Sequence, residues 1–307
     1  MATDNRARPV QIHQSVADPE SGEEAAPFIR ASQKALRAEE LRLLRRKLDG
    51  VVVFTSGTAN VVLQLSWPEV GYGVVESRVE SGQVTRHPLK RFRTTIGYIG
   101  VALLGNHELR LAYRQAINGQ HRQVRSTPDS PVKYNAFNRE LQLWVASCIH
   151  YGLVDAITRM HGPPTRHEEV VLLRASARLG TTLQVPADMW HRTPEEFWAY
   201  WEEGLERAEI DERVGDYLRG LLRADLLPAP FGRIAAMLEW LNTGFLPEPI
   251  RKQLDLTWTD RDERHHAKLM HILGALSRPL PHTLRSFPTN AMMWDLELRR
   301  RLGRPMV

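Results

Sequence analysis

Apolar residues in this chain recur at intervals of three and four positions, the spacing that gives an α-helix one hydrophobic face. The clearest case lies within residues 88–112, where one stripe contains Phe92, Ile96, Ile99 and Leu103. Apolar and polar residues do not alternate over a useful strand length. The pattern therefore predicts an all-α fold.

The same periodicity predicts helices along most of the chain. Thr193-Pro194, followed by Glu196, has the form of a capping box at a helix start. Residues 117–119 are expected to interrupt a helix just before His121. Beyond the helix over 88–112, which has a kink or break at 105–106, the predicted helices cover residues 30–47, 51–66, 135–160, 194–208, 210–224, 229–242, 247–256, 260–277 and 289–302.

No linker rich in glycine, serine or proline divides the chain, so a single helical domain is predicted over residues 28–307. Residues 1–27 are polar and not periodic, which predicts a disordered or extended N-terminal segment. No apolar run approaches the roughly 20 residues that a membrane-spanning helix needs, and the N-terminus lacks the apolar core of a signal peptide. We therefore expect a cytoplasmic protein without a transmembrane segment.

Composition narrows the possible functions. The chain has 307 residues, a formal net charge of +5 and one cysteine, Cys148. A single cysteine excludes an internal disulfide and a cysteine-based zinc site, so Cys148 is expected to be a small buried residue. The basic residues are interleaved with acidic ones, and nucleic acid is therefore not expected as a partner. Peripheral membrane contact stays open through the basic residues of 30–48.

A second face of the helix over 88–112 carries polar groups. Arg91, Thr94, Thr95 and Tyr98 follow the spacing i, i+3, i+4, i+7 and should point the same way. The face could line a binding site. The simpler interpretation is that its threonines bond to their own helix and its arginine meets solvent.

His121 and Arg125 are four residues apart, so one helical turn would direct both side chains the same way. Neutral histidine binds metals, and arginine binds carboxylates. Together with Arg91, the pair suits a haem, with the histidine on iron and the arginines on the propionates. The chain has no Cys-x-x-Cys-His motif, so such a haem would be held without covalent attachment. From composition alone, a surface histidine among 12 is the simpler interpretation.

Four segments in order resemble sequence elements of one family, that of the MpaB oxygenase and the latex-clearing rubber oxygenase. The matches are Leu63–Pro68 to L-Q-x-x-x-P, His87–Thr95 to P-x-x-R-x-x-x-T, His121–Arg125 to H-x-x-V-x, and Tyr134–Val145 to Y-x-A…L-x-x-W-V. The resemblance covers residues 50–160 best, and Leu280–Arg285 is similar to a C-terminal L-P-x-x-L-R element.

The resemblance implies an all-α fold with a globin-like core and a non-covalent b-type haem. In the family's pattern His121 stands where the proximal iron ligand stands, and Arg91, Thr95 and Arg125 match positions that line the haem pocket. The rubber enzyme has a lysine directly before the threonine, among its distal oxygen-handling groups. This chain has Thr94 there, which argues against rubber cleavage.

Taken together, the residues and the resemblance predict a haem-b-dependent oxygenase. Its substrate would be apolar, isoprenoid-like or aromatic, and its oxidant O2 or peroxide. Arg91, Thr94 and Thr95 are the predicted catalytic residues, with Tyr98 beside them in the cofactor pocket and His121 as the proximal iron ligand.

Two other functions fit the same residues. One is a haem carrier or sensor without turnover, which the missing lysine favours. The other is a cofactor-free helical interaction protein. In the rubber enzyme, the lysine at the position of Thr94 has an acidic partner. Glu76 and Glu80 are the candidates for the matching acidic residue in this chain.

Overall fold

The computed structural model describes residues 38–47, 50–77, 88–225 and 231–307, except for the side chains at positions 39, 51–54 and 88–92. These residues form α-helices joined by turns, and no strand occurs among them; Arg125 and Asn135 form an isolated bridge. The predicted all-α fold class is confirmed. The N-terminal segment predicted over residues 1–27 lies outside the described residues.

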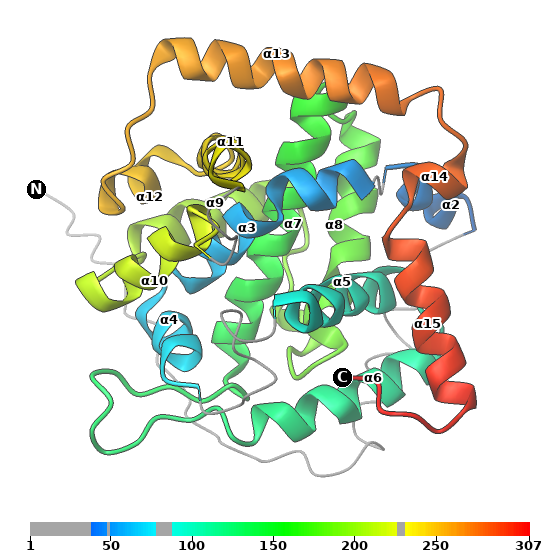
Figure 1. Ribbon diagram of the computed structural model, residues 1–307. Helices are drawn as coiled ribbons and strands as arrows, with labels where there is room; N and C mark the ends of the chain where they lie inside the picture. The colour runs from blue at the N-terminus through cyan, green and yellow to red at the C-terminus, as the bar shows by residue number, and fades with distance from the viewer. Residues whose placement is uncertain (1–37, 48–49, 78–87, 226–230) are drawn as a thin grey trace, which may run out of the picture.

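The helices follow the order shown in Figure 1. The first half of the chain forms α2 (Ala38–Lys47), α3 (Gly50–Leu65), α4 (Pro68–Val75), α5 (Pro88–Leu104), α6 (His107–His121) and α7 (Arg139–His161). The second half forms α8 (Arg166–Thr181), the 3-10 turn η2 (Ala187–Met189), α9 (Pro194–Glu206), α10 (Glu212–Leu222), α11 (Gly232–Thr243), α12 (Glu248–Gln253), α13 (Asp260–Ser277), α14 (His282–Arg285) and α15 (Thr289–Arg301).

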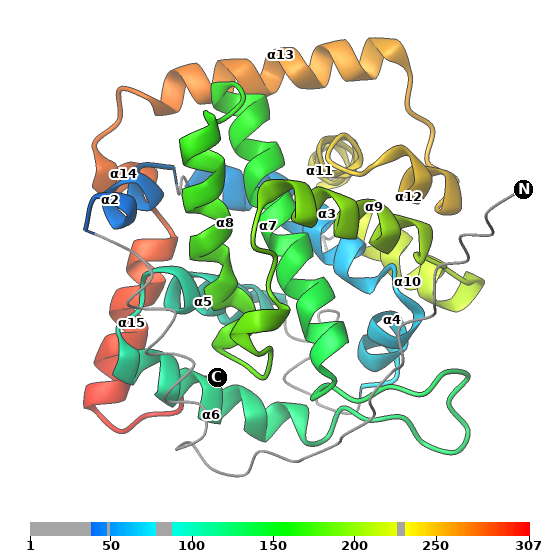
Figure 2. The ribbon, with the colours of Figure 1, turned by 180° about the vertical axis from the view of Figure 1, so that it is seen from behind.

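The longest helix, α7, runs through the middle of the molecule, with α8 beside it and α13 across its end (Figures 1 and 2). It packs against α3, α8 and α13, and Trp144 and Cys148 are fully buried on it. A helix enclosed on all sides must be apolar on most of its surface. The prediction that Cys148 is a small buried residue is confirmed.

The predicted break at residues 105–106 separates α5 from α6. The Asn106 side chain accepts a hydrogen bond from the backbone N–H of Leu109 at 2.8 Å and caps α6. Asparagine is among the residues preferred at this position. The break lets α6 leave the line of α5, so that both helices face the same interior space.

Two local predictions around His121 are wrong. Helix α6 continues through residues 117–119 without interruption and ends at His121. One glycine within a helix costs about 1 kcal/mol relative to alanine, and the burial of Leu109 and Tyr113 on the same helix outweighs that cost. Because α6 ends at His121, the helical turn predicted between His121 and Arg125 does not form.

Helix α8 is absent from the predicted helices, although it carries a start signal. Thr165 and Glu168 form a reciprocal capping box before it. The box predicted at Thr193 is only half formed. Thr193 accepts from the backbone N–H of Glu196 at 3.3 Å, but the Glu196 carboxylate accepts from the backbone of Arg192 instead.

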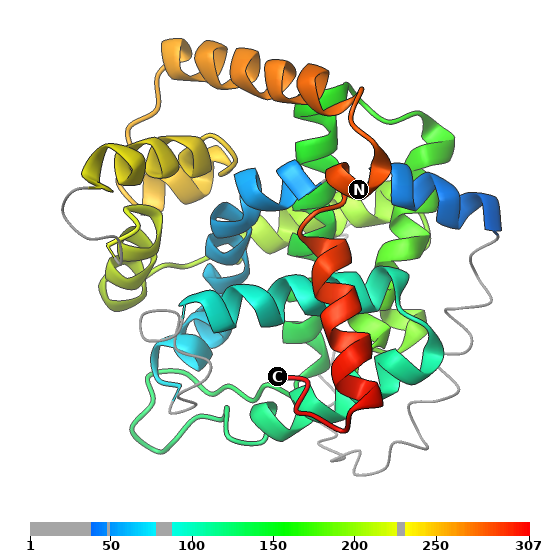
Figure 3. The ribbon, with the colours of Figure 1, turned by 45° about the vertical axis from the view of Figure 1, so that its right-hand side comes forward.

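Helix α15 packs across α5 (Figure 3), and two glycines allow this close approach. A Cβ atom at Gly97 would meet Leu296 Cδ1 at 3.1 Å, and one at Gly100 would meet Met293 Sδ at 3.0 Å. Larger residues would push α15 away from α5.

None of the helices among the described residues combines the length and the apolar character that crossing a membrane requires.

Candidate functional site

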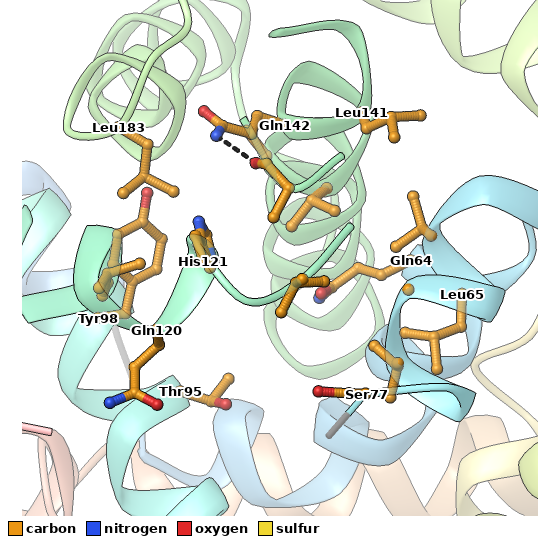
Figure 4. Close-up of a pocket in the computed structure, with 18 of the residues that line it drawn as sticks. Gln64, Leu65, Ser77, Thr95, Tyr98, Gln120, His121, Leu141, Gln142 and Leu183 are labelled. Atoms are coloured by element: carbon orange, nitrogen blue, oxygen red, sulfur yellow. Dashed lines mark hydrogen bonds between the residues drawn. The ribbon is translucent and has the colours of Figure 1, made fainter. Parts of the chain in front are cut away.

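A cavity of about 280 Å³ lies between α7 and the helices that precede it, α3 to α6. Its walls come from α3 and α4, α5, α6, α7, the loop before α7 and the end of α8 (Figure 4). Most of these walls are aliphatic. The apolar lining residues include Leu65, Val70, Val74, Ile117, Val124, Leu141, Val145, Ile149, Leu179 and Leu183.

Four of the residues predicted from sequence line this one cavity: Thr94, Thr95, Tyr98 and His121. The first three project from the same face of α5, as their helical spacing predicted, and His121 comes from the last position of α6. Arg91 belongs to α5, but its side chain is outside the described part of the structure.

His121 is half-buried, and its imidazole lies next to Tyr98 and Gln142 in Figure 4. The ring of Phe137 meets it edge to face, with centroids 6.2 Å apart. The helix predicted over 135–160 begins only at Arg139, so Phe137 precedes α7. Its position outside the helix is what brings it to His121.

Three amides fix the end of α6 against α7. Gln184 donates from Nε2 to Asn118 Oδ1 at 2.8 Å, and its backbone N–H donates to Gln142 Oε1 at 2.8 Å. Gln142 Nε2 donates to the carbonyl of Ala136 at 2.7 Å and to Gln184 Oε1 at 2.5 Å. Asn118 lies one turn before His121, so this network sets where the imidazole is presented. Sequence reasoning missed it, although a glutamine within the apolar run Leu141–Val145 was a signal.

Two tyrosine hydroxyls form hydrogen bonds that join neighbouring helices. Tyr98 donates to the backbone carbonyl of Leu179 on α8, and Tyr113 donates to the carbonyl of Thr94 at 2.8 Å. Desolvation raises the pKa of Tyr98, with a smaller opposing effect of Arg114. Tyr98 therefore presents its ring to the cavity and uses its hydroxyl to hold α5 against α8.

Arg125 is exposed and lies in the bridge with Asn135, beyond the end of α6. It does not share a helical turn with His121, which corrects the predicted pairing. Its neighbour Val124 and its bridge partner Asn135 both line the cavity. The guanidinium thus belongs to a segment at the edge of the cavity, with its side chain toward solvent.

The acidic residues near the cavity differ from expectation. Glu76 accepts hydrogen bonds from Ser130 at 2.7 Å, Tyr134 at 2.9 Å and Arg213 at 3.1 Å. Burial opposes ionisation of Glu76, but these bonds outweigh burial and lower its pKa. Glu80 lies outside the described residues. Neither prediction identified the carboxylate that lines the cavity.

That carboxylate is Glu69, at the start of α4. Its Oε1 accepts from Arg207 at 2.6 Å, whereas Oε2 is buried and has no hydrogen-bond partner within the described part of the chain. Its position directly after Trp67-Pro68, a helix start, was the available sequence signal. A buried carboxylate oxygen of this kind can exchange a proton with a ligand.

The donor set fits a porphyrin better than a bare metal ion. No group of three metal-binding side chains occurs among the described residues, and His121 is the sole imidazole among those lining the cavity. A haem brings four nitrogen ligands of its own and needs one from the protein, together with apolar walls. The described lining contains no arginine. Of the two propionate partners predicted from sequence, Arg125 is exposed and the Arg91 side chain lies outside the described part of the structure.

Fold and cavity together define a helical protein with a mostly apolar binding site, whose described lining carries one imidazole and one carboxylate. The chain belongs to the family described as "ER-bound oxygenase mpaB/B'/Rubber oxygenase, catalytic domain", whose model matches residues 44–275. The family predicted from the sequence motifs is confirmed.

Two mycobacterial proteins are similar over most of the chain. They are "Uncharacterized protein Rv2237" of Mycobacterium tuberculosis and "Uncharacterized protein Mb2261" of Mycobacterium bovis. Each is 41% identical over 250 residues, which is 81% of this chain and 98% of the relative. No solved structure matches, and the globin-like core stays a prediction.

Proposed function

We propose that this chain is a haem-b-dependent oxygenase of an apolar substrate, with His121 as the proximal iron ligand. Membership of an oxygenase family supports the reaction class. The observation that carries the cofactor assignment is the position of His121. Among the described residues, it is the one imidazole lining an aliphatic cavity that also presents Thr94 and Thr95.

In this proposal the protein's own residues hold and orient the cofactor. His121 would bind the iron through a ring nitrogen, and the amides of Gln184, Gln142 and Asn118 hold the end of α6 that carries this histidine. Arg125, on its edge segment, pairs with a propionate. When bound, the haem supplies oxygen binding and redox chemistry.

The chemical class of the substrate is inferred from the residues that line the cavity. Aliphatic side chains exclude water and favour an isoprenoid-like or aromatic molecule over a polar one. Thr94 and Thr95 place hydroxyl groups on the same wall. Glu69 supplies the ionisable group, and its buried Oε2 takes up or releases the proton that oxygen chemistry requires. O2 or peroxide is the second substrate.

The test is turnover under 18O2 by haem-loaded protein, with a panel of terpenoid and aromatic compounds. We expect a product that contains 18O. The rate of product formation should be lower in Glu69→Gln by roughly 10²-fold or more. Glu209→Gln, at an exposed carboxylate, is the matched control and should keep full activity. A Glu69→Gln variant as active as the control would remove this residue from the mechanism.

A carrier or sensor of haem is the second candidate, and the threonine at the lysine position favours it. Such a protein would bind haem through His121 but form no product with any compound of the panel. A sample that stays colourless after expression with added haem would instead favour the cofactor-free interaction protein.

A further inference from the structure

Several large apolar side chains in the C-terminal part of the molecule are exposed and do not belong to the core. We call this set the C-terminal patch. Trp294 is its most exposed member, with 71% of its surface accessible. The patch consists of Leu280, Leu284, Phe287, Trp294, Leu298 and Leu302.

The part of the patch on α15 is held in position by packing against α5. On α15, Leu296 and Met293 face α5 at the two glycines, which leaves Trp294 and Leu298, one turn apart, on the outer side. Helix α14 lies directly above α15 on the same side of the molecule (Figure 3). The outer face of α15 is therefore held in position by the packing of its inner face.

Helix α14 is also held in position, by contacts with the backbone of α2. His282 Nε2 lies 3.1 Å from the carbonyl of Arg45, and Arg285 donates to the carbonyl of Arg46 at 2.7 Å. A Cβ atom at Gly50 would lie 1.6 Å from the carbonyl oxygen of Phe287. The backbone of this segment thus sits against α2 and the start of α3, while the Leu284 and Phe287 side chains stay exposed.

The surroundings of the patch are cationic. Residues 278–307 contain six arginines and two carboxylates, in a chain whose net charge is only +5. Both carboxylates are bound by arginines: Asp295 by Arg299 at 2.7 Å, and Glu297 by Arg300 at 2.9 Å. Helix α2, which contacts α14, adds three exposed arginines, Arg42, Arg45 and Arg46.

Exposed tryptophan and leucine within a basic rim match the interface of an anionic bilayer, where aromatic and aliphatic groups enter the headgroup region and cations meet phosphates. A second copy of the chain would bring two basic rims together, which electrostatics opposes. We propose that the C-terminal patch docks this protein on anionic membrane surfaces. The proposal does not depend on the haem.

Docking here would also place α15 between the bilayer and the cavity. The inner face of α15 packs on α5, and Val307, which follows this helix, lines the cavity. An apolar molecule dissolved in the bilayer would then lie close to the C-terminal segment that contributes Val307 to the cavity.

The experiment is co-sedimentation of the full-length protein with vesicles of phosphatidylcholine alone or with phosphatidylserine. We expect binding to the anionic vesicles, weakening as salt is raised. The double variant Trp294→Ser, Leu298→Ser should bind roughly tenfold more weakly or worse, because both side chains lose their apolar contact. Trp198→Ser is the matched control, since Trp198 is an exposed tryptophan on α9, outside the patch.

Folding of each variant is checked by its thermal unfolding midpoint, which the exposed double substitution should leave unchanged. Trp198→Ser removes ring contacts with Tyr151 and Phe197, so its binding is measured well below its own unfolding midpoint. Equal loss of binding in the double variant and the Trp198 control would overturn the proposal, as would no binding to anionic vesicles. Light scattering that shows a dimer abolished by the double variant would assign the patch to a second copy and also overturn it.

Discussion

Histidine residues in this protein lie in two different kinds of environment. His121 faces an aliphatic cavity, whereas His150 is enclosed in the core, with Nδ1 2.9 Å from Ser176 Oγ and its ring against Phe197. His266 is likewise buried, with Nε2 3.0 Å from the carbonyl of Leu241. The sequence alone does not separate these environments, because each histidine lies in a helix.

The buried histidine makes stability depend on pH. Desolvation, with a smaller effect of His191, lowers the pKa of His150 from 6.5 to about 3. The unfolded chain therefore takes up a proton as pH falls below 6.5, while the folded protein does not. This group alone should reduce the free energy of unfolding by about 2 kcal/mol between pH 7 and pH 5. Urea titrations at the two pH values measure the difference.

His150→Gln should lose less stability over this pH interval than the wild type does. The exposed His167→Gln is the control and should keep the wild-type pH dependence. If His150→Gln showed the same pH dependence as the wild type, protonation of His150 would not contribute to acid sensitivity.

At the scale of elements, the amide network positions the end of α6. Replacing Gln184 by alanine removes the bonds to Asn118 and Gln142 and leaves buried amide groups unpaired. We expect Gln184→Ala to lower the free energy of unfolding by about 1–3 kcal/mol and to weaken haem retention, because α6 carries His121. Exposed Gln123→Ala should change neither quantity. Urea unfolding and haem transfer to apomyoglobin measure the two effects.

The face of α5 could be predicted because helical spacing is local: Thr94, Thr95 and Tyr98 reach one cavity as their positions require. The end of α6 could not be predicted in the same way. Backbone bonds of 2.9 Å from Ala136 to Val124, and from Ser126 to the carbonyl of Tyr134, draw the chain away from a helical path after His121.

The amide network and the position of Glu69 could not be predicted from the sequence, because both depend on tertiary packing. Asn118, Gln142 and Gln184 lie on separate elements, and nothing local to any one of them indicates the other two. Glu69 looks like a helix-start carboxylate in the sequence, and its place in the cavity wall depends on how α4 packs. Helix α8 is different, since the capping box at Thr165 was visible and could have identified it.

At the scale of the whole molecule, the cavity and helices α9 to α13 lie on different sides of α3 and α7. The described residues that line the cavity come from α3 to α8, with Val307 as the contribution of the C-terminal end. Helices α9 to α13 pack on the other side of α3 and α7 (Figures 1 and 2). The first half of the chain therefore builds most of the described cavity lining, and helices α9 to α13 complete the core.

The absorbance spectrum of the purified protein, expressed with added haem, tests the central claim most directly. The proposal predicts a Soret band in the wild type, its loss or a large shift in His121→Ala, and an unchanged band in the control His167→Ala. A wild type that stays colourless, or a His121→Ala spectrum identical to that of the wild type, would contradict the assignment of His121 as the iron ligand.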